Sequence, residues 1–228
     1  MTLQVPVLAI DGPSGSGKGT ISRRVANQLG WHLLDSGALY RIVALAGRRE
    51  GLDSGDEAGH AQLAANMKVR FGMTQSGEEL ILLGDEESDI TREIRTEEAG
   101  QGASRVAVWP QVRSALLDRQ RGFARPPGLV ADGRDMGTVV FPAAALKIYL
   151  TASAEERARR RHNQLKDKES GASLAALSLE IAERDRRDST RAVAPLRPAA
   201  DAVLLDSTHL TITEVVEQVM AEVRARRL

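Results

Sequence analysis

One glycine-rich run near the amino terminus constrains the fold of this chain more than any other segment. It follows a short apolar stretch at 5–10 and continues into a segment in which Ile21, Val25 and Leu29 are spaced four residues apart. The apolar stretch predicts a strand, and the spacing predicts an amphipathic helix. Strand, glycine-rich turn, lysine and helix together predict a loop that wraps a phosphate group, because glycines let several backbone N–H groups point inward at a helix N-terminus.

The residue types in this run predict its chemistry. Lys18 is expected to reach the terminal phosphates of a nucleotide as a compact point charge. Gly19 stands where the general phosphate-loop motif has Ser or Thr, and the hydroxyl follows one residue later at Thr20. The residues predicted to bind the triphosphate are Gly12, Pro13, Ser14, Gly15, Ser16, Gly17, Lys18, Gly19 and Thr20.

Composition narrows the class of protein. Apolar residues make up 42% and charged residues 27% of the 228, as is usual for a globular protein. The formal net charge is zero, so nucleic-acid binding is not expected. Without cysteine the chain has no disulfides or thiolate metal sites, which fits a cytoplasmic protein. No apolar run approaches the roughly 20 residues that span a bilayer, so we expect no membrane contact, and no pattern demands a partner surface, so we expect a monomer.

Short apolar runs alternate with helical patterns along the chain. The predicted strands are 7–10, 32–34, 129–131, 146–150 and 202–205. The predicted helices are 20–29, 38–49, 112–123, 154–164, 174–187 and a last one that starts at the capping box of Thr211 and Glu214. This alternation predicts an α/β fold, a five-stranded parallel sheet with helices on both faces. Ligands bind at the carboxyl edge of such a sheet, where Asp11, Asp35 and Asp132 end their strands.

One segment breaks the alternation. The alternating stretch 68–73, a turn at 74–78 and the apolar stretch 80–83 predict a small antiparallel β insert, with a third strand near Asp89 as an alternative. Residues 51–60 are rich in Gly, Asp and Glu and are predicted to be the loop that leads into it.

Charged residues concentrate near the predicted carboxyl edge. Phosphoryl transfer spreads negative charge over the transferred group, and arginines can stabilise that charge. Arg41 and Arg134 follow predicted strands, and a third set comprises Arg157, Arg159, Arg160, Arg161, Arg184, Arg186, Arg187 and Arg191. For Arg159, Arg160 and Arg187 we favour a solvated helix face. Asp132 is expected near Lys18, where it would hold Mg²⁺ or its waters, the alternative being a helix or turn cap.

Two other kinds of site are excluded. The four histidines lie far apart in different elements and have no zinc-ligand spacing. Residues 12–16 only approximate the Gly-x-Ser-x-Gly turn of serine hydrolases, because Ser16 stands where that turn needs glycine.

Several segments resemble the bacterial cytidylate kinase family of nucleoside monophosphate kinases. They are 10–20, 33–41, 94–96, 131–142 and 183–195, and the segments Asp-Gly-Arg-Asp-Met-Gly-Thr from Asp132 and Arg-Ala-Val-Ala-Pro from Arg191 are more specific than the phosphate loop. The resemblance implies a P-loop kinase that uses Mg²⁺ and transfers the γ-phosphate of ATP to CMP or dCMP in pyrimidine nucleotide metabolism. It also implies a single domain over 1–228, with its core at 1–62 and 101–228, a nucleotide-binding insert at about 63–100 and a short helical lid at about 154–172.

The resemblance also implies roles for individual residues. Ser36, Arg41, Arg134 and Arg191 would bind the monophosphate, Ser104, Arg113 and Asp135 would read cytosine, and Arg184 and Asp188 would hold the sugar. The implied catalytic residues are Lys18, Asp132, Arg134, Arg157 and Arg161, with Arg157 and Arg161 in the lid. Mg²⁺ would lie near Thr20 and near Asp132, reached through water. A carboxylate and an arginine also complement the amino donor and the ring acceptors of cytosine. From the residues alone, Ser104 and Arg113 would be interpreted as helix surface.

Two other functions stay open at this point. The phosphate loop does not separate a cytidylate kinase from a kinase for a different nucleotide on the same scaffold. A GTP-dependent switch protein is disfavoured because Asn27, Asn66 and Asn163 are each followed by a residue other than lysine, which leaves no Asn-Lys-x-Asp guanine motif.

Overall fold

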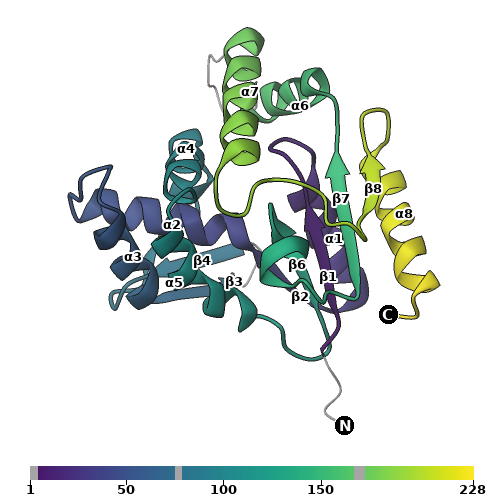
Figure 1. The fold of residues 1–228 in the computed structure, drawn as a ribbon, viewed down its shortest axis with the longest axis horizontal. Helices are drawn as coiled ribbons and strands as arrows, with labels where there is room; N and C mark the ends of the chain where they lie inside the picture. The colour runs from purple at the N-terminus through teal and green to yellow at the C-terminus, as the bar shows by residue number, and fades with distance from the viewer. Residues whose placement is uncertain (1–4, 75–78, 167–172) are drawn as a thin grey trace. The chain divides into compact units, whose positions relative to one another are not determined.

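The computed structural model describes residues 5–74, 79–166 and 173–228. Its larger sheet has five strands, β1 (Val7–Asp11), β2 (His32–Asp35), β6 (Leu129–Gly133), β7 (Leu146–Thr151) and β8 (Val203–Asp206). They run in the order β2-β6-β1-β7-β8, and every neighbouring pair is parallel (Figure 1). The five predicted strands and the parallel sheet are therefore confirmed.

Helices fill most of the connections between strands. They are α1 (Lys18–Leu29), α2 (Ser36–Arg49), α3 (Glu57–Asn66), α4 (Glu97–Val106), α5 (Pro110–Arg121), α6 (Ala154–Lys166), α7 (Leu174–Thr190) and α8 (Ile212–Ala225). A 3₁₀ turn spans Glu93–Arg95, and a π-helical turn at Met136–Val140 follows β6. The capping box predicted for α8 is present, with Thr211 and Glu214 each bonded to the backbone N–H of the other. No helix of the described residues is long and apolar enough to cross a bilayer.

The chain divides into two compact units, residues 1–36 with 120–228 and residues 37–119. The first unit holds the large sheet, with β1 between β6 and β7 (Figure 1). All five residues of β1 are buried, as expected for the centre of a parallel sheet. Leu8 and Ile10 of β1 pack with Val25 of α1 and Val219 of α8 in one apolar core. This core fixes the strand end from which the phosphate loop departs.

The second unit contains the predicted β insert. Its strands β3 (Val69–Met73) and β4 (Glu79–Leu83) pair antiparallel, and the short β5 (Ser88–Asp89) adds a third strand to β4. The hairpin and its third strand are confirmed, although most of the predicted turn lies outside the described residues, as do residues 167–172 of the predicted lid. The second unit spans residues 37–119, whereas the predicted insert spans about 63–100. The extent of the nucleotide-binding insert stays a prediction.

The predicted loop at 51–60 is wrong over its second half. The α3 helix begins at Glu57, because the Asp56 side chain caps it by accepting the backbone N–H of Gly59. The α4 helix, which had no predicted counterpart, starts in the same way from Thr96, whose hydroxyl accepts the N–H of Ala99.

Candidate active site

The phosphate loop joins β1 to α1 by a path that requires glycine. A Cβ on Gly12 would lie 2.0 Å from the carbonyl oxygen of Leu150 in β7, so no larger residue fits there. Gly17 precedes α1 with a φ of 89°, and no side chain caps the helix. The first N–H groups of α1 are thus set at the loop, where they favour an anion. Lys18 folds across the loop, and its Nζ donates to the carbonyl oxygen of Pro13 at 3.0 Å.

Asp132 is the last residue but one of β6, the strand beside β1, and lies close to the start of α1. Its Oδ2 is 3.3 Å from the place that a Cβ on Gly19 would occupy. The prediction that Asp132 lies near the residues around Lys18 is therefore confirmed. Burial raises the pKa of Asp132, and burial together with Arg134 lowers the pKa of Lys18. The attraction between the Asp132 carboxylate and the Lys18 ammonium opposes both shifts.

The residues near the loop fit a magnesium ion bound together with phosphates. Oδ1 of Asp132 is buried and has no hydrogen-bond partner among the described residues. Thr20 lies exposed in the first turn of α1, within the same loop segment. No cluster of three or more acidic or histidine side chains that would cage a metal occurs in the described ranges. Magnesium keeps several waters and needs only one or two protein oxygens beside substrate phosphates, so this sparse donor set suits it.

Arginine–carboxylate pairs join the end of β6 to α7 and the residue after it. Arg134 donates from Nε to Oδ2 of Asp188 at 2.9 Å, and Arg191 places Nη2 at 4.0 Å from Oδ1 of Asp135. Asp135, Asp188 and Arg191 are buried. Burial alone would raise the pKa of Asp188, but the nearby Arg134 and Arg184 guanidinium groups lower it below its usual value. Four of the residues predicted to bind CMP thus lie together in the first unit.

The carboxylate of Asp11 fixes the turn that follows these residues. It accepts the backbone N–H groups of Met136 and Gly137, both at 2.8 Å. Burial raises its pKa to about 6, and the two N–H donors counteract part of that shift. The π-helical turn begins directly after Asp135, so Asp11 sets the position from which that side chain projects. An aspartate at the end of the central strand is the only sequence feature that pointed to this residue.

The arginines of α6 divide into two groups. Arg157 is buried and pairs with Asp185 of α7 at 2.6 Å. Arg159 is exposed and pairs with Glu156, as predicted for a solvated face. The same prediction is wrong for Arg160, which is half-buried and donates to backbone and hydroxyl oxygens of the phosphate loop and of the turn after β8. Arg161 lies half-buried on the same helix.

Three further predicted site residues belong to the second unit. Arg41 on α2 donates from Nη1 to the carbonyl oxygen of Ile94 at 2.8 Å. Arg113 on α5 is buried, donates to the carbonyl oxygen of Ala107 at 3.2 Å and lies 5.8 Å above the ring of Tyr40. Ser104 on α4 is also buried. The interpretation of Ser104 and Arg113 as helix surface is therefore wrong.

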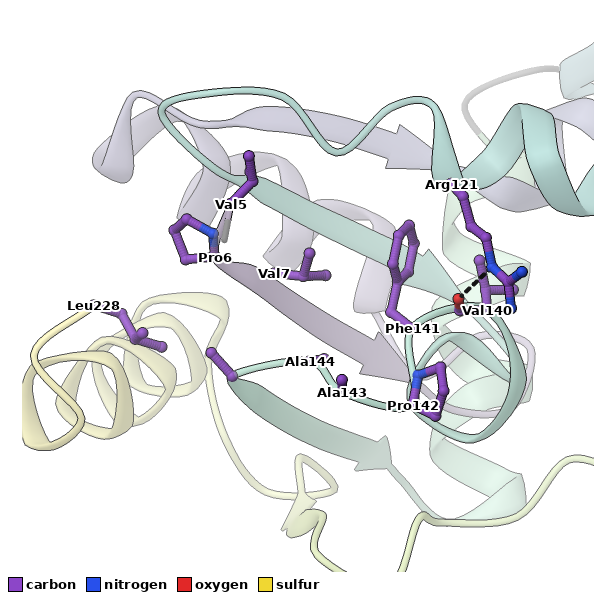
Figure 2. A pocket seen from close by; sticks show the side chains of 11 residues that line it. Val5, Pro6, Val7, Arg121, Val140, Phe141, Pro142, Ala143, Ala144 and Leu228 are labelled. Atoms are coloured by element: carbon purple, nitrogen blue, oxygen red, sulfur yellow. Dashed lines mark hydrogen bonds between the residues drawn. The ribbon is translucent and has the colours of Figure 1, made fainter. Parts of the chain in front are cut away.

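A separate cavity lies at the opposite end of β1 and β7. It has a volume of about 460 Å³, and its lining includes Pro6, Phe141, Ala145 and Leu228 (Figure 2). Arg121 borders it and donates from Nε to the carbonyl oxygen of Val140 at 3.1 Å (Figure 2). None of the predicted site residues lines this cavity. The candidate site is therefore the charged carboxyl edge of the sheet and not this apolar hollow.

Comparison with known proteins agrees with this site. A family model described as cytidylate kinase matches residues 8–225. The cytidylate kinase of Pseudomonas fluorescens (strain SBW25) is 58% identical over 227 residues, covering 99% of this chain and 98% of that protein. That of Stutzerimonas stutzeri (strain A1501) is 56% identical over 228 residues, covering 100% and 99%. The chain belongs to the cytidylate kinase family.

Proposed function

We propose that the residues gathered around the phosphate loop carry out the reaction of this family in this chain. That reaction is the ATP-dependent phosphorylation of CMP and dCMP, which yields ADP with CDP or dCDP. The observation that carries the assignment of roles is a cluster of charged side chains in the first unit, the half-buried Lys18 and Arg134 with the buried Asp132 and Asp188, which interact around the start of α1 and the end of β6.

The donor nucleotide is proposed to bind along residues 12–20. The N–H groups of the loop and the Lys18 ammonium would hold the triphosphate, as the geometry of the glycines supports. Asp132, through water, and Thr20 would hold Mg²⁺, which supplies positive charge at the phosphates when bound. Arg157 and Arg161 of α6 would add charge at the transferred group.

The acceptor nucleotide is proposed to bind through the residues that the family resemblance implies. Ser36, Arg41, Arg134 and Arg191 would bind its phosphate, and Arg184 and Asp188 its sugar. Ser104, Arg113 and Asp135 would read cytosine, and the burial of all three supports this role. Uracil has a carbonyl where cytosine has its amino group, so it would face Asp135 unfavourably. Buried polar groups left unpaired by the wrong base discriminate strongly.

The chemical step needs orientation and charge more than proton transfer. The attacking oxygen of the CMP phosphate is already anionic, so no strong general base is required. Arg134 is held by Asp188, which presents its guanidinium in one orientation. Lys18 and the arginines would then stabilise the charge that spreads over the transferred group.

An acceptor panel tests the proposed roles. In a coupled assay with ATP and Mg²⁺, CMP and dCMP should be markedly better acceptors than AMP, GMP and dTMP. The same assay with Arg113→Ala should lose this preference while ATP affinity stays unchanged. If the variant keeps the preference, the proposed reading of cytosine is wrong. Chelation with EDTA should abolish turnover, and added Mg²⁺ should restore it.

We also propose that the protein is a cytoplasmic monomer that serves pyrimidine nucleotide metabolism and does not bind nucleic acid. The zero net charge and the absence of cysteine support this setting. Light scattering at working concentration tests the monomer, and a mass of twice that of one chain would contradict it.

A further inference from the structure

The outer side of the phosphate loop packs against one face of α6. A Cβ on Gly15, whose φ is +76°, would lie 3.0 Å from the Cβ of Arg157 and 3.2 Å from its carbonyl oxygen. A Cβ on Gly17, whose φ is +89°, would lie 3.6 Å from Nη1 of Arg160. The loop therefore rests directly on the helix, and its glycines permit both the left-handed backbone and the close approach.

Two arginines of this helix face donate to carbonyl oxygens of the loop. Nη1 of Arg157 lies 3.0 Å from the carbonyl oxygen of Ser14, and Nη1 of Arg160 lies 3.2 Å from that of Ser16. Arginines three positions apart on a helix stand side by side, so Arg157 and Arg160 reach two carbonyls of the same turn. When N–H groups of such a loop turn toward a phosphate, intervening carbonyls turn away and need donors of their own.

Arg160 also joins the loop to the turn after β8. Its Nη1 donates to Oγ of Ser207 at 3.0 Å, and its Nη2 donates to the carbonyl oxygen of the same residue at 2.6 Å. Ser207 is buried, and its Oγ lies 2.9 Å from the carbonyl oxygen of Thr151 and 3.3 Å from that of Ser16. On its remaining side, Nε of Arg160 donates to Glu156 at 2.7 Å. One guanidinium thus connects α6, the phosphate loop and the end of β8.

We propose that Arg160 is a positioning residue for the ATP-binding loop. By holding the carbonyl of Ser16 outward, it keeps the neighbouring N–H groups and Lys18, two residues further on, in the arrangement that receives the triphosphate. The inference rests on the proposed function, since it takes residues 12–20 as the donor site. A loop that is fixed before binding loses less conformational freedom when the nucleotide arrives, so the contact contributes to ATP affinity.

The geometry requires arginine specifically. The planar guanidinium offers five N–H donors in a fixed fork, which here reach Glu156, Ser16 and both oxygens of Ser207. The single ammonium of lysine, on a flexible stem, does not span these acceptors at once.

The neighbouring Arg159 provides a matched control. Both arginines lie on α6 and both pair with Glu156, but the Arg159 side chain is 62% exposed. Arg160→Ala should raise the KM for ATP about tenfold or more, the effect of losing charge-assisted hydrogen bonds, while the KM for CMP stays within about twofold. Arg159→Ala should leave both constants within about twofold. Arg160→Lys should recover part of the ATP affinity but not all of it.

Isothermal titration with ATP and thermal unfolding without nucleotide complete the test. If Arg160→Ala lowers the melting temperature but keeps the ATP affinity of Arg159→Ala, Arg160 is merely structural and the inference is overturned. Should Arg160→Ala fail to fold, Ser207→Ala removes the bridging hydroxyl alone and should raise the ATP KM about threefold, a loss in the range of one net hydrogen bond. An unchanged KM in that variant overturns the inference as well.

Lys18→Ala separates this inference from the proposed function. If it loses ATP binding while Arg160→Ala does not, the positioning role alone fails. If Lys18→Ala still binds ATP with full affinity, the assignment of the donor site fails first, and the role of Arg160 fails with it.

Discussion

Two ion pairs near the phosphate loop and two ion pairs of the other compact unit differ in how far their side chains are exposed to solvent. In the unit of residues 1–36 and 120–228, the side chains of the pairs Arg134–Asp188 and Arg157–Asp185 are between 7% and 25% exposed. In the unit of residues 37–119, those of the pairs Arg48–Glu93 and Lys68–Asp85 are between 37% and 79% exposed. These two pairs of the first unit are largely shielded from solvent, although the same unit also carries exposed pairs such as Arg186–Glu183, whereas these two pairs of the second unit lie on its surface.

We interpret this difference as one between charges that are proposed to serve chemistry and charges that cover a surface. Burying an ion pair costs desolvation that the attraction often only offsets, so stability alone gives little reason to keep one. The pairs Arg134–Asp188 and Arg157–Asp185 lie beside the phosphate loop, where the proposed phosphate transfer would need fixed cations. In the second unit, too, burial of polar side chains coincides with a proposed function, because the buried Arg113 and Ser104 are the residues proposed to read the base.

The largest expected effect comes from Lys18, a half-buried cation of the first unit. Lys18→Ala should lower kcat/KM for ATP by about 10³-fold, because the loop then lacks its charge toward the terminal phosphates. Lys68→Ala removes an exposed cation of the second unit and should change kcat/KM by less than about twofold. Steady-state assays of both variants measure the contrast. Similar losses in the two would show that burial does not distinguish functional charges here.

A smaller effect, confined to one substrate, is expected from Asp135→Ala. The variant should lower kcat/KM for CMP by about 10²-fold or more, because cytosine loses the acceptor for its amino group. ATP affinity, measured by titration, should stay near that of the unchanged protein. Equal losses for ATP and CMP would contradict the role in reading the base and point to a general disturbance of the site.

Asp11→Asn tests whether burial raises the pKa of a carboxyl group in the first unit. Burial raises the folded pKa of Asp11 from 3.8 to about 6, so the folded protein binds this proton more tightly than the unfolded chain does. The stability that Asp11 contributes is complete below pH 3.8 and is lost as the pH rises through about 6. From pH 5 to pH 7, the unfolding free energy of the unchanged protein minus that of the variant should fall by about 1 kcal/mol. Urea unfolding at both pH values measures it, and a flat or rising difference would contradict the shift.

The fold could be predicted from the sequence because each of its signals is local. Apolar runs mark the strands, four-residue spacing marks α1, and the Thr211–Glu214 box marks α8. The α4 helix was not predicted, because its glycines weaken the helical pattern of the sequence. Gly102 is there for packing, since a Cβ on it would lie 2.9 Å from the Cβ of Ala44.

The site could be predicted only where the residues concerned lie in one short segment with a characteristic pattern, as the glycines and Lys18 of the phosphate loop do. Asp11 is 125 residues from Met136, and its role depends on the strand order that brings the two together. Arg159 and Arg160 are neighbours of identical type, so sequence pattern alone does not separate them. Their difference arises because the glycines of the phosphate loop rest on the Arg160 side of α6.

The smallest expected effect belongs to the surface of the second unit. Arg48 pairs with Glu93 at 3.1 Å, with both side chains well exposed to solvent. Arg48→Ala should change the free energy of unfolding by less than about 1 kcal/mol and leave turnover within about twofold, because water screens the pair in the folded state. Urea unfolding at low and high salt measures this change. A loss several times larger, or one that salt does not reduce, would mean that exposed ion pairs of this unit also stabilise the fold. The exposed and shielded pairs would then differ in where they lie but not in how much they stabilise the protein.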